Sequence, residues 1–200
     1  MIRDCLVIAV EGTHASGKTT LVHALTSTLR EHGINAACTG EPARSSPFIE
    51  DIVIHGRGGF DLAAEVDLFG AQLTTQLRAA RHHTVLITDK TLFNVVAYAR
   101  LLLPAADRPA VEAMTTLCMA LAGWYDSVLY CSDIFDPRQP GDDFRVKVAD
   151  RQRDVDQALC DLLRLAGSPL TEIPAALSTS DRVQWILTRL AEDGLLTALS

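Results

Sequence analysis

The sequence predicts an α/β fold, a doubly wound and mainly parallel sheet of five strands with helices on both faces. Short apolar runs alternate five times with longer segments whose apolar residues recur at helical spacing, the order that builds a parallel sheet. A glycine-rich segment directly follows the first apolar run, and such sheets bind ligands at the carboxyl ends of their strands. The 200 residues show no repeat and no linker, so residues 1–200 are expected to form one domain.

The sequence marks the five predicted strands with different clarity. Leu6–Val10 is an unbroken apolar run, as in a parallel strand that is buried on both faces. Val85–Ile87 is a shorter run that ends at Thr88 and Asp89. The remaining strands are expected at residues 34–39, 127–131 and 170–173.

Helices are expected between and after these strands. In the first helix leucines recur at every fourth position, at Leu21, Leu25 and Leu29. The longest helix is expected at residues 61–81, and its buried stripe is predicted to consist of Val66, Phe69, Leu73 and Leu77. The other helices are expected at residues 48–54, 92–103, 109–122, 149–166 and 181–190. Pro104 ends one of them, and Ser180 is expected to cap the last.

Residues 12–19 read G-x-x-x-x-G-K-T, the pattern of a phosphate-binding loop between a strand and a helix. Its glycines let the backbone wrap closely, so that successive N–H groups point at phosphate oxygens near a helix N-terminus. Lys18 can reach the β- and γ-phosphates, and the hydroxyl of Thr19 can bind magnesium. The sequence therefore predicts that ATP and Mg²⁺ bind to Gly12, Thr13, His14, Ala15, Ser16, Gly17, Lys18, Thr19 and Thr20.

Two carboxylates follow strands at this edge of the predicted sheet. Glu11 immediately precedes the loop, and it either orders the loop through backbone hydrogen bonds or acts as a general base on an acceptor hydroxyl. Asp89 ends the third strand, where it can bind magnesium directly, bind it through water, or hold the acceptor. An additional role in capping the following helix is compatible with each of these.

Arginines provide the remaining candidate contacts to phosphate or substrate. Arg145, Arg151 and Arg153 lie in a polar segment, about residues 134–156, which suits a lid over the transferred phosphoryl group. Acidic residues alternate with them, so surface ion pairs are the alternative interpretation. Arg44, beyond the second strand, either holds an anionic or hydroxylated substrate or is solvated.

Composition excludes several other classes of protein. The net charge is −7 and no basic stripe is present, which argues against a nucleic-acid partner. The five cysteines are dispersed, so reduced thiols are expected in place of disulfides or a zinc site. No apolar run approaches the roughly twenty residues that span a bilayer, and no signal peptide is recognised. A cytoplasmic protein without a membrane partner is expected, and its oligomeric state, a homodimer included, stays open.

The N-terminal half resembles thymidylate kinases and deoxynucleoside kinases. The likeness covers Glu11–Thr20 and Glu41-Pro42, and it continues in Asp89-Lys90 with Ala97-Tyr98 downstream. The resemblance to deoxynucleoside kinases implies that Glu11 acts as the base. Lys90 stands where thymidylate kinases have arginine, and the rest of the thymidylate kinase glycine signature after Glu41-Pro42 is missing.

The C-terminal half is similar to a different group. Residues 125–133, 142–145 and 151–155 resemble the nicotinamide riboside kinase domain of the bacterial NAD-regulator family and related AAA-type ATPases. In that group the acidic pair and the arginines lie in the lid region, which implies the same place for Arg145, Arg151 and Arg153.

These features predict an ATP- and magnesium-dependent kinase that phosphorylates a nucleoside, a nucleotide or a related hydroxylated metabolite. The loop and Lys18 would hold the phosphates, Thr19 and Asp89 would organise magnesium, and Glu11 or Asp89 would align the acceptor. A regulatory NTPase without a phosphoryl acceptor is the main alternative. A nucleotide-binding module without catalysis is a third interpretation, which the Lys18-Thr19 pair disfavours.

Overall fold

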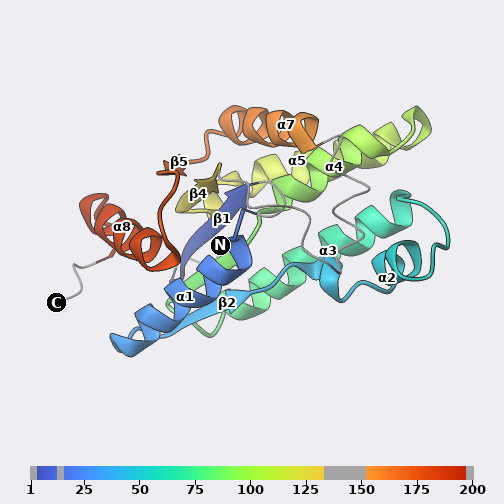
Figure 1. The fold of residues 1–200 in the computed structure, drawn as a ribbon. Helices are drawn as coiled ribbons and strands as arrows, with labels where there is room; N and C mark the ends of the chain where they lie inside the picture. The colour runs from blue at the N-terminus through green and yellow to red at the C-terminus, as the bar shows by residue number, and fades with distance from the viewer. Residues whose placement is uncertain (1–3, 13–15, 133–151, 197–200) are drawn as a thin grey trace.

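The computed structural model describes residues 4–12, 16–132 and 152–196, and the elements below refer to these ranges. All neighbouring strands of the sheet are parallel, in the order β2-β3-β1-β4-β5 (Figure 1). The strands are β1 (Leu6–Gly12), β2 (Ala36–Thr39), β3 (Val85–Asp89), β4 (Ser127–Cys131) and β5 (Leu170–Ile173). The predicted five-stranded sheet is therefore confirmed, and it is parallel throughout.

The central strand β1 determines where the functional site lies. It pairs with β3 on one side and β4 on the other, with Val10 beside Asp89 and Gly12 beside Cys131. The carboxyl ends of three adjacent strands thus meet at one edge of the sheet. Because β1 is parallel to both neighbours, residues that follow these strands lie close together there.

Helices cover both faces of the sheet, as the alternation of side chains along β1 requires. Val7 and Ala9 pack in one core with α3, α4, α5 and α7, whereas Ile8 and Val10 pack in another with α1 and α8. The first group is α3 (Leu62–Ala80), α4 (Leu92–Leu102), α5 (Arg108–Ala120) and α7 (Gln152–Leu165). The second is α1 (Lys18–Glu31) and α8 (Thr179–Glu192). Short helical segments are η1 (Pro42–Arg44), α2 (Pro47–Val53), η2 (Ala105–Asp107) and η3 (Ala122–Trp124).

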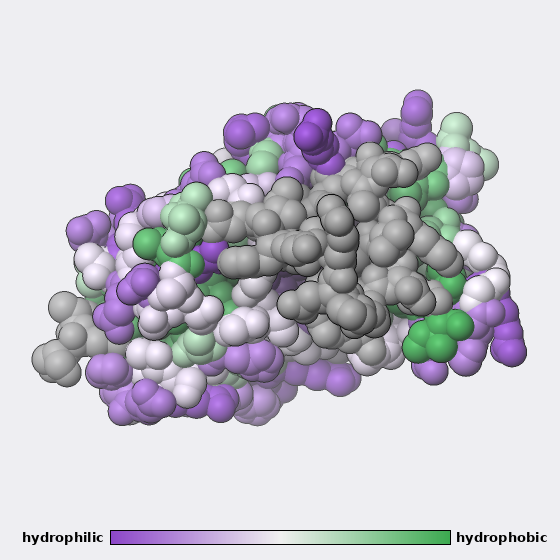
Figure 2. Space-filling view, viewed as in Figure 1, coloured by the Kyte–Doolittle hydropathy of each residue, from purple (hydrophilic) through white to green (hydrophobic). Residues whose placement is uncertain are grey.

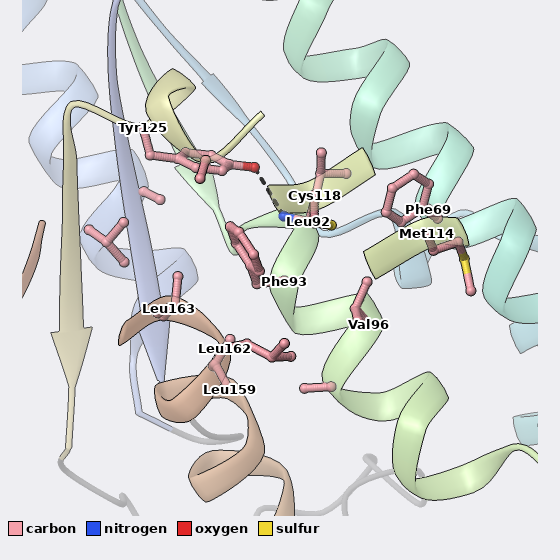
Figure 3. Packing of buried hydrophobic residues seen from close by; sticks show 14 of the residues in the cluster. Phe69, Leu92, Phe93, Val96, Met114, Cys118, Tyr125, Leu159, Leu162 and Leu163 are labelled. Carbon is pink, nitrogen blue, oxygen red and sulfur yellow. Dashed lines mark hydrogen bonds between the residues drawn. The ribbon is translucent and has the colours of Figure 1, made fainter. Parts of the chain in front are cut away.

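Figure 3 shows the larger core, in which side chains of α4 and α7 pack together. The hydroxyl of Tyr125 lies inside it and accepts a hydrogen bond of 3.0 Å from the backbone N–H of Leu92. The same hydroxyl donates to Oε1 of Gln76 at 3.0 Å. Tyr125 therefore packs in the core and also links the start of α4 to α3.

The predicted stripe of α3 is buried only in part. Phe69 is buried and Leu73 packs against the same core, whereas Val66 and Leu77 are exposed. The buried face also carries the polar residues Glu65, Gln72 and Gln76. Gln72 and Gln76 both donate hydrogen bonds to the backbone carbonyl of Lys90, at 2.9 and 3.2 Å. The helix turns these amides inward because the backbone beyond β3 needs hydrogen-bond donors inside the protein.

Several predicted boundaries also shift. The last helix begins two residues earlier than expected, and Ser178, not Ser180, accepts the hydrogen bond from the N–H of Asp181. The second strand begins at Ala36, and the predicted helix at 149–166 is described as Gln152–Leu165. None of the five cysteines forms a disulfide.

Hydrophilic residues lie along the outer helices on the face shown in Figure 2. Among the described helices, none combines the length and the apolar character needed to cross a membrane.

Candidate active site

The two glycines of the phosphate loop have backbone conformations that favour glycine. Gly12 has φ of 133°, and a Cβ atom there would collide with the carbonyl oxygen of Cys131 on the adjacent strand. Gly17 has φ of 77° and immediately precedes α1. These positions hold the ends of the loop between β1 and the N-terminus of α1, whereas Thr13, His14 and Ala15 lie outside the described residues.

Lys18 begins α1 and is almost completely buried, with 7% of its surface exposed. Its Nζ atom donates a hydrogen bond to Oγ of Ser16 at 3.1 Å. Burial lowers the pKa of the Lys18 ammonium group, and the positive charge of Lys90 lowers it further. A phosphate group beside Lys18 would raise the pKa of the ammonium group and favour its charged form. The site of Lys18 therefore suits an anionic ligand.

Thr19 and Asp89, the two residues predicted to bind magnesium, lie close together. The hydroxyl of Thr19 donates to Oδ2 of Asp89 at 2.7 Å, and Asp89 is 1% exposed. The other carboxylate atom, Oδ1, is buried without a hydrogen-bond partner among the described residues. A hydroxyl and a carboxylate fit Mg²⁺, which typically binds one or two protein oxygens and keeps several waters. Thr20, the last residue of the predicted set, is exposed.

Arg182 supports the loop from α8, and the sequence analysis missed it. This side chain is 3% exposed and donates to the backbone carbonyl of Ser16 at 3.1 Å and of Leu177 at 3.2 Å. It joins residues that lie 166 positions apart in the chain. No local pattern marks such an arginine, because only the packing of α8 against α1 brings it to the loop.

Glu11 is fully buried, and both of its carboxylate oxygens accept hydrogen bonds. Oε1 accepts from the backbone N–H and the hydroxyl of Thr91, each at 2.6 Å, and Oε2 accepts from Nδ2 of Asn94 at 3.1 Å. Burial raises the pKa of Glu11, and the hydrogen bonds from Thr91 oppose that rise. These contacts favour the ordering role over the role of general base, because they tie β1 to the start of α4.

A pocket of about 510 Å³, counting its solvent-open part, lies between α3, α4 and the segment that follows β2. Thr91 and Asn94, the two partners of Glu11, belong to its lining, so its wall is connected directly to the residue that precedes the loop. The polar lining consists of Glu41, Glu65, Gln72, Lys90, Thr91 and Asn94, with the hydroxyl of Tyr98 in addition.

Lys90 and Glu41 form a buried ion pair in this lining, with 2.6 Å between Nζ and Oε1. Burial acts to lower the pKa of Lys90, but the carboxylate of Glu41, together with Tyr98 and Asp89, holds the pKa above its ordinary value. Lys90 has φ of 76°, an unusual value for a residue with a side chain, and its Nζ lies 5.7 Å from the ring centre of Tyr98. The motif residues Glu41-Pro42 and Asp89-Lys90 therefore meet in space, a contact that the sequence analysis did not predict.

Glu65 is a further residue that the sequence did not indicate. It lies in the first turn of α3, is 1% exposed and lines the pocket. Its Oε2 atom has no hydrogen-bond partner among the described residues. Burial raises the pKa of Glu65 from 4.5 to about 7, although the charge of Lys90 acts in the opposite direction.

This shift predicts that the protein without ligand loses stability as the pH rises. Because the folded state binds the Glu65 proton more tightly than the unfolded state, its contribution is complete below pH 4.5 and lost as the pH rises through about 7. The contribution of Glu65 to the free energy of unfolding should fall by about 3 kcal/mol across that range. Glu65→Gln should therefore raise Tm at pH 8 much more than at pH 5. Equal changes in Tm at both pH values would contradict this assignment.

Of the four arginines predicted to contact phosphate or substrate, the structure describes the side chain of one. Arg145 and Arg151 lie outside the described residues, as does the side chain of Arg44, whose backbone belongs to η1. Arg153 is described and is exposed in the first turn of α7. Contact between these arginines and phosphate, and the lid at about 134–156, remain predictions.

Comparison with solved structures finds the same fold in other proteins. NadR protein in complex with NR is similar with a TM-score of 0.74 and 19% identity, and thymidylate kinase from Candida albicans with 0.68 and 14%. Deoxyadenosine kinase from M. mycoides with bound dATP is similar with 0.55 and 16%. These alignments cover 96%, 96% and 92% of this chain, and 51%, 93% and 99% of the other chains. The chain thus spans about half the length of NadR, and at these identities the likeness shows the fold.

Sequence comparison then assigns the family. No curated protein matches the chain. A family profile described as "AAA domain" matches residues 7–182, which include the phosphate loop, Asp89 and Arg182. The chain therefore belongs to this AAA domain family and has the P-loop kinase-like fold that the sequence predicted.

Proposed function

We propose that the protein is a magnesium-dependent kinase that transfers the γ-phosphoryl group of ATP to a hydroxyl group of a small molecule. The observation that carries this proposal is the direct link between two sites. Glu11 precedes the phosphate loop in the chain and binds Thr91 and Asn94 in the wall of the pocket. A nucleotide held by the loop and an acceptor held in the pocket would therefore lie side by side, as phosphoryl transfer requires.

Each polar residue at the loop has a role in this proposal. Lys18 binds the β- and γ-phosphates and stabilises the charge that develops on the transferred group. Thr19 and Asp89 hold Mg²⁺, which would neutralise phosphate charge when bound. Arg145, Arg151 or Arg153 would contact the γ-phosphate from a lid.

The acceptor residues act on the other reactant. The acceptor oxygen forms a bond to the γ-phosphorus while the bond from that phosphorus to the β–γ bridging oxygen breaks. The acceptor hydroxyl loses its proton to a carboxylate near the loop, either Glu11 or Asp89. Glu11 then positions Thr91 and Asn94.

We propose further that residues 1–200 act as one cytoplasmic catalytic domain.

Release of ADP with and without added acceptors tests the proposal. The panel contains nucleosides, nucleotides and other hydroxylated metabolites, each at saturating ATP and Mg²⁺. We expect at least one compound to accelerate ADP release and to appear as its phosphate ester. Steady ADP release that no acceptor accelerates would favour the regulatory NTPase instead.

Binding of ATP and magnesium should stabilise the folded protein by mass action. At a nucleotide concentration one hundred times its Kd, the free energy of unfolding should increase by about 2.7 kcal/mol. Chelation of magnesium should remove most of that gain, because Asp89 would otherwise lie close to the phosphates without a cation between them. The measurement is a melting curve with ATP, with ATP-Mg and without nucleotide. An unchanged curve at millimolar ATP-Mg would contradict nucleotide binding.

A further inference from the structure

The proposed chemistry does not use Glu65, a pocket residue with a buried carboxylate oxygen that has no hydrogen-bond partner among the described residues. The residue is 1% exposed and lines the pocket, and its Oε2 has no hydrogen-bond partner among the described residues. A buried acceptor in this state costs free energy, so native proteins leave few of them unpaired. A ligand that donates a hydrogen bond to Oε2 would remove that cost.

The surrounding groups do not supply the donor. Lys90 is the cation whose charge acts on Glu65, but its Nζ forms the ion pair with Glu41. Gln72 directs its Nε2 at the backbone carbonyl of Lys90, at 2.9 Å. Lys90 and Gln72 thus bind other protein acceptors, whereas Oε2 of Glu65 has no hydrogen-bond partner among the described residues.

The charges of the pocket also limit what it can hold. Its described lining contains two carboxylates, Glu41 and Glu65, and one cation, Lys90, which is paired with the first of them. A phosphate group near Glu65 would place two anions together in a poorly solvated space. A neutral or cationic ligand with N–H groups has no such penalty.

The remaining walls favour a flat, apolar body. They are formed by Pro42, Ala43, Ile49, Phe60, Leu68 and Val95. Pockets with such walls and few polar groups bind apolar ring systems and use the polar groups to set orientation. Glu65, in the first turn of α3, lines the same pocket and can accept a hydrogen bond from a ring bound there.

We propose that Glu65 is the residue that determines acceptor specificity, and that it accepts a hydrogen bond from an N–H group on a planar ring of a phosphate-free acceptor. The inference rests on the proposed kinase function, because it takes the pocket to be the acceptor site. Binding of such a ring would favour the ionised form of Glu65, so a proton would be released near neutral pH.

Matched pairs of ligands test this directly, in binding experiments without ATP. The probes are adenosine with purine riboside, and cytidine with its analogue that lacks the 4-amino group, because each pair differs in one amino donor. The monophosphates of adenosine and cytidine complete the set. Kd is measured by calorimetry for the wild-type protein, for Glu65→Gln and Glu65→Met, and for Glu112→Gln, which changes an exposed glutamate on α5 as a control.

We expect the amino-bearing member of at least one pair to bind about tenfold or more tightly than its analogue. That preference should be lost in Glu65→Met, be reduced in Glu65→Gln and persist in Glu112→Gln, while the monophosphate binds more weakly than the nucleoside. Calorimetry in buffers of different ionisation enthalpy should show proton release near pH 7 in the wild-type protein and none in Glu65→Met.

Four results would overturn the assignment: equal binding within both pairs, a preference that survives Glu65→Met, tighter binding of a monophosphate, or no binding by any probe. Failure of the kinase proposal would look different. In that case the amino-bearing probe binds with the Glu65-dependent preference, yet neither it nor any other acceptor accelerates ADP release.

Discussion

Lys18→Ala is expected to reduce phosphoryl transfer by at least about a thousandfold, the scale on which a single cation stabilises this kind of transition state. The lysine matters most when charge develops on the transferred group, so its loss should lower kcat more than it weakens ATP binding. The rate is measured as ADP release with the best acceptor found. Arg78→Ala, which removes an exposed cation on α3, is the control and should leave the rate unchanged.

Stability should respond to Lys18→Ala in the opposite direction to activity. Lys18 is 7% exposed, and burial together with the charge of Lys90 lowers its pKa. Removing a buried cation relieves that penalty, so Tm without nucleotide should stay the same or rise. A variant with near-normal ADP release would show that the loop is not the catalytic centre, whereas a large fall in Tm would make the loss of activity uninformative.

Asp89→Asn is expected to have the second largest effect, because it removes a charge from the predicted magnesium site and keeps the shape of the side chain. The amide can still accept a hydrogen bond from Thr19, whereas the second carboxylate oxygen is lost as a ligand. Transfer should slow by about a hundredfold or more, and half-maximal activity should require more Mg²⁺. A titration of ADP release with Mg²⁺ measures both quantities.

Glu11→Gln is the matched comparison for Asp89→Asn, because it makes the same chemical change at the neighbouring strand. A base at Glu11 would make transfer fall severely, with little change in ATP-Mg binding and Tm. The ordering role predicts a fall in Tm together with weaker acceptor binding, since one partner among Thr91 and Asn94 would face an amide N–H group. Normal transfer and normal Tm in Glu11→Gln, with an unchanged response to Mg²⁺ in Asp89→Asn, would contradict the proposed roles of both carboxylates.

The interpretation of α3 shows where reasoning from the sequence fails. Two of the four residues of the predicted stripe lie against the core, whereas Val66 and Leu77 are exposed. The buried face also carries Glu65 and two glutamines. Apolar periodicity predicts the buried face of a helix on the assumption that this face packs against apolar side chains only. The backbone around Lys90 needs hydrogen-bond donors, and this long-range requirement turns α3 toward its polar side.

By itself, the sequence determined the sheet, the phosphate loop and the pairing of Thr19 with Asp89, because these depend on local patterns and on the rule that parallel strands share a carboxyl edge. The tertiary structure alone decided three other features, namely the Lys90–Glu41 ion pair, the support of the loop by Arg182, and the unpaired oxygen of Glu65 beside the pocket. The ion pair and the support by Arg182 join residues that are distant in the chain. The third feature arises because folding buries Oε2 of Glu65 without a hydrogen-bond donor among the described residues. Local patterns contain no record of such contacts, because burial and hydrogen bonding are settled only when the helices pack.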